Sequence, residues 1–213
     1  MAVAAPESLT YDSLIADVMS YADNSNERFV TQLPRLVMLA ENRLATDVKG
    51  LGLIRVVNGE FISGNPVVDK PARWRETLHL LLTVSGQRQF ILPRSYEQCR
   101  AYWPDQSVTG TPRFYSDYDY EHLFVVPTPA SALDFELAYY ERPEPLSESR
   151  QSNWTTRYAP QLLLYATLLE AQSFLSRPER VPEFKALYDE AKMAVAKEDL
   201  RRGTEKHAAV NRM

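Results

Sequence analysis

The sequence has a single cysteine, Cys99, among its 213 residues. One cysteine cannot form an intramolecular disulfide, and a chain of this length can bury a hydrophobic core without one. A lone thiol is typical of a reducing compartment. The residues MAVAAPESLT have neither the basic segment nor the apolar segment of a signal peptide. The sequence therefore predicts a protein that is made in the cytoplasm.

Long apolar runs and an excess of basic residues are also lacking. The longest apolar run, from Leu162 to Leu169, is far shorter than the ~18 residues that indicate a membrane span. The net charge is −4, whereas proteins that hold nucleic acid tightly show a basic patch or stripe. We expect no membrane partner, and we expect any DNA near the protein to pass without being gripped.

Motifs for catalysis and metal binding are missing as well. The chain has only seven glycines and no glycine-rich phosphate loop, dinucleotide fingerprint or nucleophile elbow. His79, His122 and His207 stand in different predicted elements, and none has a second histidine or cysteine at ligand spacing. Cys99 lies beside Arg100 but has no recognisable catalytic partner. We expect no enzymatic activity, no metal and no cofactor.

One dense carboxylate cluster is present, in DYDYE from Asp117 to Glu121. It could hold calcium or act as an acid and base pair. In an extended strand, however, Asp117, Asp119 and Glu121 share one face, and the two tyrosines share the other. The interpretation that we prefer is a solvated acidic strand face over an aromatic underside.

Apolar spacing predicts helices at both ends of the chain and strands between them. Helical periodicity over residues 9–22, with Thr10 as N-cap, and over 29–48, ended by Gly50, predicts an αα-hairpin. Pro34 either kinks the second helix or marks its first turn. Two further helices are predicted over residues 153–175, capped by Ser152 or Asn153, and from about 181 to Gly203.

The middle of the chain has the alternation and turn signals of an antiparallel meander. Asn58-Gly59 and Ser85-Gly86 are predicted hairpin turns, and residues 95–103 are predicted to form a short helix. The expected fold class is α+β, a helical bundle from N- and C-terminal hairpins with a central antiparallel β-rich insertion. The expected parts are residues 1–50, 51–143 and 144–202, followed by a mobile tail, 203–213.

Three ordered segments resemble the head-tail adaptor, or connector, proteins of tailed bacteriophages, including relatives of the tail tubular protein A type. The segments are LPRSYEQCRAYWPD, GTPRFYSDYDYEHLFVVPTPASALDFELAYYERPEPLS and NWTTRYAPQLLLYATLLEAQSFL. The resemblance covers about residues 92–191. Its most distinctive part is the proline-bounded VVPTPASALDFELAYYERP followed by the LLLYATLLEA helix.

The resemblance implies a structural virion protein without catalysis. Its relatives assemble into a ring, commonly of twelve subunits, that docks on the portal protein at the head-tail junction. The ring extends the DNA channel without binding DNA specifically and offers a platform to the next tail or neck protein. In some relatives the C-terminal segment inserts into the portal. The corresponding portal-binding hypothesis here covers Arg201, Arg202, Lys206, His207, Val210, Arg212 and Met213.

The helix predicted over residues 153–175 is apolar on nearly every side, which indicates burial on several sides. A ring subunit needs two heterologous faces, so the face with Leu163, Thr167, Glu170 and Phe174 is the expected contact with a neighbour. If the same chain covers that face, this support for a ring is lost.

A second hypothesis is a β-domain binding module of a tail or baseplate component that recognises another virion protein or a glycan. Its contact residues would be aromatic, namely Tyr115, Tyr118, Tyr120, Tyr139 and Tyr140. The location of the protein in the virion would separate the two hypotheses.

Overall fold

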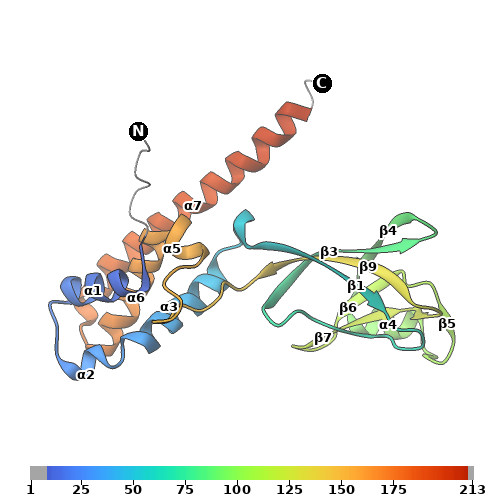
Figure 1. Cartoon of the computed structure of the whole chain (residues 1–213), viewed down its shortest axis with the longest axis horizontal. Coiled ribbons are helices and arrows are strands. Elements are labelled where there is room, and N and C mark those ends of the chain that lie inside the picture. Colours follow the sequence, from blue (N-terminus) through green and yellow to red (C-terminus); the bar gives the residue numbers. More distant parts are fainter. Residues whose placement is uncertain (1–8, 211–213) are drawn as a thin grey trace. The chain divides into compact units, whose positions relative to one another are not determined.

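The computed structural model describes the backbone of residues 9–210 and the side chains as far as Arg202. The chain divides into two compact units (Figure 1). The helical unit comes from both ends of the chain, Met1–Leu53 and Pro143–Met213, and the β unit is the middle segment, Ile54–Arg142.

The helical unit has four principal helices and several short ones. The N-terminal part contains α1 (Tyr11–Ala22), α2 (Glu27–Val30), α3 (Leu33–Asp47) and the 3₁₀ turn η1 (Leu51–Leu53). The C-terminal part contains α5 (Trp154–Tyr158), α6 (Pro160–Phe174), the 3₁₀ turn η2 (Pro178–Arg180) and α7 (Val181–Val210). Thr10 caps α1 through a capping box, and Pro34 lies in the first turn of α3; both agree with the sequence.

Two helix predictions are wrong in detail. The segment 153–175 is not one helix, because it breaks at Ala159, whose φ of −140° and ψ of 47° are not helical. Pro160 follows, and the residue before a proline is disfavoured in the helical region. Gly203 does not end the last helix, since α7 continues through it to Val210. One glycine costs a helix only about 1 kcal/mol, which a long helix can accommodate.

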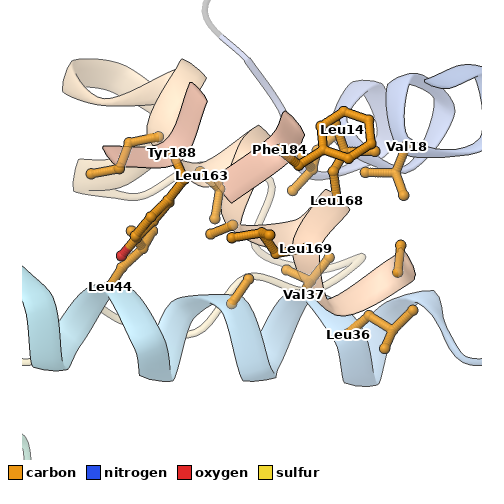
Figure 2. Packing of buried hydrophobic residues seen from close by; sticks show 14 of the residues in the cluster. Leu14, Val18, Leu36, Val37, Leu44, Leu163, Leu168, Leu169, Phe184 and Tyr188 are labelled. Carbon is orange, nitrogen blue, oxygen red and sulfur yellow. The ribbon is translucent and has the colours of Figure 1, made fainter. Parts of the chain in front are cut away.

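One hydrophobic cluster holds the helical unit together. Figure 2 shows some of its side chains, among them Leu14 of α1, Leu44 of α3, Leu163 of α6 and Tyr188 of α7. Leu14 and Leu163 are fully buried. Burial of a leucine side chain contributes roughly 1.5–3 kcal/mol, so this shared cluster is what joins the two ends of the chain into one unit.

The β unit is built on a seven-stranded sheet in the order β1-β9-β3-β4-β6-β7-β2. The strands are β1 (Ile54–Phe61), β2 (Val67–Asp69), β3 (Trp74–Val84), β4 (Gln87–Pro93), β6 (Phe114–Asp117), β7 (His122–Val126) and β9 (Leu133–Glu141). The short β5 (Thr109–Gly110) and β8 (Thr128–Pro129) form a second, two-stranded sheet. The short helix α4 (Tyr96–Tyr102) lies between β4 and β6 in the chain.

Of the two predicted hairpin turns, one is confirmed and one is wrong. Ser85 and Gly86 have positive φ and join β3 to β4, as a type I′ turn requires. Asn58-Gly59 instead lies inside β1, paired with β9. The Phe135 ring covers Gly59 so closely that an added Cβ would lie 2.5 Å from its Cζ atom. Gly59 is therefore a place of close approach within a strand.

The expected fold class is wrong. The protein has a mixed α/β structure in which 44% of the residues are helical and 27% lie in strands, with the seven strands forming a large, nearly closed sheet. The sheet is not wholly antiparallel, because β4 and β6 run parallel and parallel neighbours need a crossover, which α4 supplies. The β unit also has buried clusters of its own, so it is more than an insertion into a bundle.

Candidate interaction surfaces

The face of α6 that the sequence assigned to a neighbouring subunit is largely covered by the same chain. Leu163 and Thr167 are fully buried. The Glu170 carboxylate binds the guanidinium of Arg43, with Oε1 2.6 Å from Nη2. Phe174 stacks on Phe29 and keeps 37% of its surface exposed. Contacts within the same chain therefore account for the apolar residues on nearly every side of α6. They no longer support a subunit interface on this helix, and this argument for a ring is lost.

The acidic residues do not share one strand face. Asp117 ends β6, whereas Asp119 and Glu121 lie in the turn before β7. The Asp119 carboxylate accepts hydrogen bonds from the backbone N–H groups of Glu121 and His122, each at 2.7 Å. It also lies 2.9 Å from Nδ1 of His122. The carboxylate of Asp119 thus stabilises the turn, which the strand interpretation did not foresee.

The charge of His122 is coupled to this turn. Its hydrogen bond with Asp119 raises the pKa of the imidazole and lowers the pKa of the Asp119 carboxyl. Asp69 adds a second acidic neighbour, with Oδ1 3.6 Å from Nε2 of His122. In the described residues no group of three or more histidine, cysteine and acidic side chains is arranged to hold a metal ion.

The C-terminal helix presents its last described side chains to solvent. Arg201 and Arg202 are exposed on α7, and Arg202 forms an ion pair with Glu198 one turn earlier. Lys206, His207 and Val210 lie on the same helix, with side chains outside the described part. Arg212 and Met213 lie outside the described residues altogether.

A feature that the sequence analysis missed is a pocket of about 550 Å³ in the β unit. Lys70, Trp74 and Arg75 line it from the β2–β3 connector and the start of β3. Asp117, Asp119 and Tyr120 line it from the end of β6 and the turn that follows, and Arg142 lines it from the end of β9. These residues come from three separate segments of the chain, so no local motif marks the pocket.

Comparison with known protein families decides the identity of the chain. Residues 9–212 match the family described as SU10 adaptor protein. The chain belongs to this family. It is therefore a bacteriophage adaptor-type protein and a component of the virion. No curated protein matches the sequence.

Cys99 and His79, which the sequence analysis considered as catalytic or metal-binding candidates, both pack against other residues of the adaptor. Cys99 is buried, and burial raises the pKa of its thiol, which disfavours the reactive thiolate. Nε2 of His79 lies 3.8 Å from Oε1 of Glu136, and its ring packs edge-on against Phe90. No helix in the described part of the adaptor is long and apolar enough to cross a membrane.

The tyrosines of the binding-module hypothesis divide between core and surface. Tyr115 and Tyr139 are buried and belong to the main cluster of the β unit. Tyr140 is half-buried, and Tyr118 stacks on Tyr96 and Phe124. Tyr120 is 98% exposed. Of these five tyrosines it is therefore the one most available for contact with a partner.

Proposed function

We propose that the adaptor assembles with copies of itself into a ring at the head-tail junction of the phage. In this proposal the ring docks on the portal protein through the C-terminal end of α7, extends the DNA channel and offers a platform to the next neck or tail protein. Family membership supports an adaptor role, and the form of α7 supports the choice of docking element.

The observation that carries the proposal is the length of α7 beyond its core. Ala191 is the last residue of this helix in the buried cluster, with Val195 packed half-buried against it. Leu200 is 69% exposed, and the helix still continues to Val210 (Figure 1). A helix end that extends past the core of its own unit can enter a groove on a partner.

The charge of the adaptor is consistent with a DNA channel. Phosphate contacts from lysine and arginine hold DNA in place, and a net charge of −4 gives little of that attraction. We propose that DNA passes through the ring without specific binding, and that the adaptor performs no catalysis and needs no cofactor.

The test is the mass of assemblies formed by the purified adaptor, measured by mass photometry with and without its cognate portal protein. We expect a ring, or a ring-portal complex, in at least one condition. A variant that lacks Gly203–Met213 should keep its thermal unfolding temperature, because its core on α7 ends at Ala191, but should lose portal docking.

Arg28→Ala is the matched control for charge. The deleted segment carries Lys206 and Arg212 against Glu205, a net charge of +1, and Arg28→Ala removes the same charge from an exposed position on α2. The control variant should dock normally. Absence of any ring or portal complex would refute the proposed function, whereas docking by the truncated variant would refute only the role of the tail.

A further inference from the structure

One face of the seven-stranded sheet is exposed although much of it is apolar. The register of four neighbouring strands places one row of residues side by side, namely Asn58, Glu136, Leu81 and Phe90. Val56 lies two residues from Asn58, and Leu92 lies two residues from Phe90, so both share the face of this row. Val56, Phe90 and Leu92 are 56%, 66% and 47% exposed. With Leu81 they form a surface that we call the outer sheet face.

Two like charges stand opposite each other at one end of the outer sheet face. Glu60 of β1 pairs with Asp134 of β9, and both residues are exposed. Like charges directly opposite on neighbouring strands are destabilising. Glu136 on the same face is bound by Arg88 at 3.3 Å, but neither Glu60 nor Asp134 has an ion pair within the part of the chain that the structure describes. A cation from a partner would therefore compensate this acidic pair.

The helix α7 has a surface of complementary character. Met193 is 55% exposed and Leu200 is 69% exposed, and Ala196 between them is exposed as well. Spacings of three and four residues place these side chains, together with that of Lys197, on one side of the helix. Lys197 is exposed and forms no ion pair among the described residues. We call these four residues the α7 stripe.

The α7 stripe is turned away from the core of its own unit. Ala191 is the last residue of α7 in the buried cluster, and at 3.6 residues per turn it lies on the opposite side of the helix from the stripe. The hydrophobic core of the helical unit therefore does not account for apolar side chains at Met193 and Leu200.

The two surfaces also match in size. Val56 and Leu92 lie on β1 and β4, which are three strand intervals apart in the sheet, a distance of about 14 Å. The helix rises about 10 Å from Met193 to Leu200. A helix laid across these strands can place its apolar side chains on the outer sheet face and direct Lys197 to the acidic pair at its end.

We infer that the α7 stripe of one adaptor packs on the outer sheet face of a second copy, with Lys197 binding the acidic pair. A second copy is the occupant because the same chain supplies a helix of fitting size, apolar character and charge. The contact is heterologous, since each copy offers its sheet to one neighbour and its helix to the other, so it can repeat around a ring. It rests on the proposed function and deepens it by naming the surfaces of neighbouring copies. Both surfaces remain in a chain that lacks Gly203–Met213.

Charge-swap variants of the full chain test the contact of Lys197 with the acidic pair. Self-association is measured by sedimentation velocity over a range of protein concentrations, with and without the cognate portal protein. We expect Lys197→Glu to weaken association by about tenfold, because like charges then face each other, and Asp134→Lys to weaken it by a smaller factor. Arg35→Glu is the control, since it makes the same charge change as Lys197→Glu at an exposed position on α3 and should leave association unchanged.

An equimolar mixture of the Lys197→Glu and Asp134→Lys chains shows whether the charges meet across copies. In alternating order each swapped helix meets a swapped sheet, and each unchanged helix meets an unchanged sheet. We therefore expect the mixture to associate more tightly than either variant alone and to approach the wild type.

Phe90→Ser tests the apolar part of the contact. Phe90 is 66% exposed and belongs to no buried cluster, so the variant should keep its thermal unfolding temperature. We expect its self-association to weaken by about tenfold or more, since an aromatic side chain at the centre of an interface contributes much of the binding energy. Tyr158→Ser on α5 is the control, because Tyr158 is aromatic and 63% exposed but lies outside both surfaces. It should associate as the wild type does.

Three results would overturn the inference. These are wild-type association in both Lys197→Glu and Phe90→Ser, a mixture that associates no better than either charge swap alone, and a wild-type chain that never associates, free or with the portal. A ring that ignores these variants would leave the proposed function intact. Association that depends on them but gives only dimers or open chains, with no ring or portal complex, would refute the proposed function and keep the contact.

Discussion

The side-chain amide of Asn153 donates a hydrogen bond of 2.8 Å to the Glu41 carboxylate, which joins α3 to the start of α5. The same carboxylate accepts the backbone N–H of Leu146 at 3.2 Å. Asn153 also caps α5 by accepting from the N–H groups of Thr155 and Thr156. One glutamate thus holds the connector between the β unit and the C-terminal helices against α3.

Burial gives this glutamate an unusual titration. Desolvation raises the pKa of Glu41 from 4.5 to about 7, although its hydrogen bonds from Leu146 and Asn153 act in the opposite direction. Between pH 4.5 and 7 the folded state therefore binds more protons at this site than the unfolded state. Stability from this site falls as pH rises through that window, by on the order of 2–3 kcal/mol, and is level above it.

The first prediction is that Glu41→Gln removes this pH dependence. We expect the free energy of unfolding of the wild type, measured with urea, to fall by about 2–3 kcal/mol more than that of the variant between pH 5 and pH 8. The variant should be the more stable protein at pH 8. Glu190→Gln, at an exposed position on α7, is the control and should follow the wild type. A wild-type profile in Glu41→Gln would show that Glu41 is not the titrating group.

The second prediction concerns a close contact between Gly52 and Trp154. A Cβ on Gly52 would lie 1.9 Å from Nε1 of Trp154, far inside van der Waals contact. Gly52→Ala should lower the free energy of unfolding by about 1–3 kcal/mol through overpacking. In a Trp154→Ala background the same substitution should cost almost nothing. An equal cost in both backgrounds would show that backbone conformation, and not the indole, excludes a side chain.

Local patterns predicted the helices well because their signals are local. Thr10 and Pro34 act within one turn of the helix that they begin, and the apolar spacing of α1 and α3 selects their buried residues. The break at Ala159 could also have been found from the sequence, since Pro160 disfavours helix in the residue before it. The prediction of one continuous helix followed the apolar residues on both sides of Pro160 and gave the proline no weight.

Strand order could not be predicted in the same way. Asn58-Gly59 and Ser85-Gly86 both have hairpin chemistry, but β1 pairs with β9, far along the chain, whereas β3 pairs with β4. In the folded β unit Gly59 pairs with Phe135 of β9, whose ring leaves no room for a side chain there, and this contact joins residues far apart in the sequence. The pocket was missed for the same reason, because Lys70, Asp117 and Arg142 meet only once the sheet has formed.

The third prediction concerns Lys70, the buried cation of the β unit, whose side chain is only 2% exposed. Lys70→Met keeps an unbranched side chain against Trp74 but loses the ion pair with Asp117. Since the Asp117 side chain is 63% exposed, water can solvate it afterwards, and the cost should be about 1–3 kcal/mol, below the range for a fully buried pair. Lys185→Met, which breaks an exposed ion pair with Asp189, should cost at most about 0.5 kcal/mol. Urea unfolding of both variants measures the difference, and equal costs would show that the burial of Lys70 adds nothing to its ion pair.

The fourth prediction concerns a buried amide on α6. Gln172 is fully buried, and within the described part of the chain neither its Oε1 nor its Nε2 has a hydrogen-bond partner. A buried amide without partners costs about 1–3 kcal/mol, so Gln172→Met, which is similar in length and flexible, should raise the free energy of unfolding by about 1–2 kcal/mol. Gln161→Met on the same helix is exposed and should change stability by less than about 0.5 kcal/mol. Urea unfolding of both variants measures the difference. A loss of stability in Gln172→Met would mean that the amide is bound by a group such as a buried water molecule. A gain in stability that is confined to Gln172→Met would establish that this amide weakens the core of the helical unit.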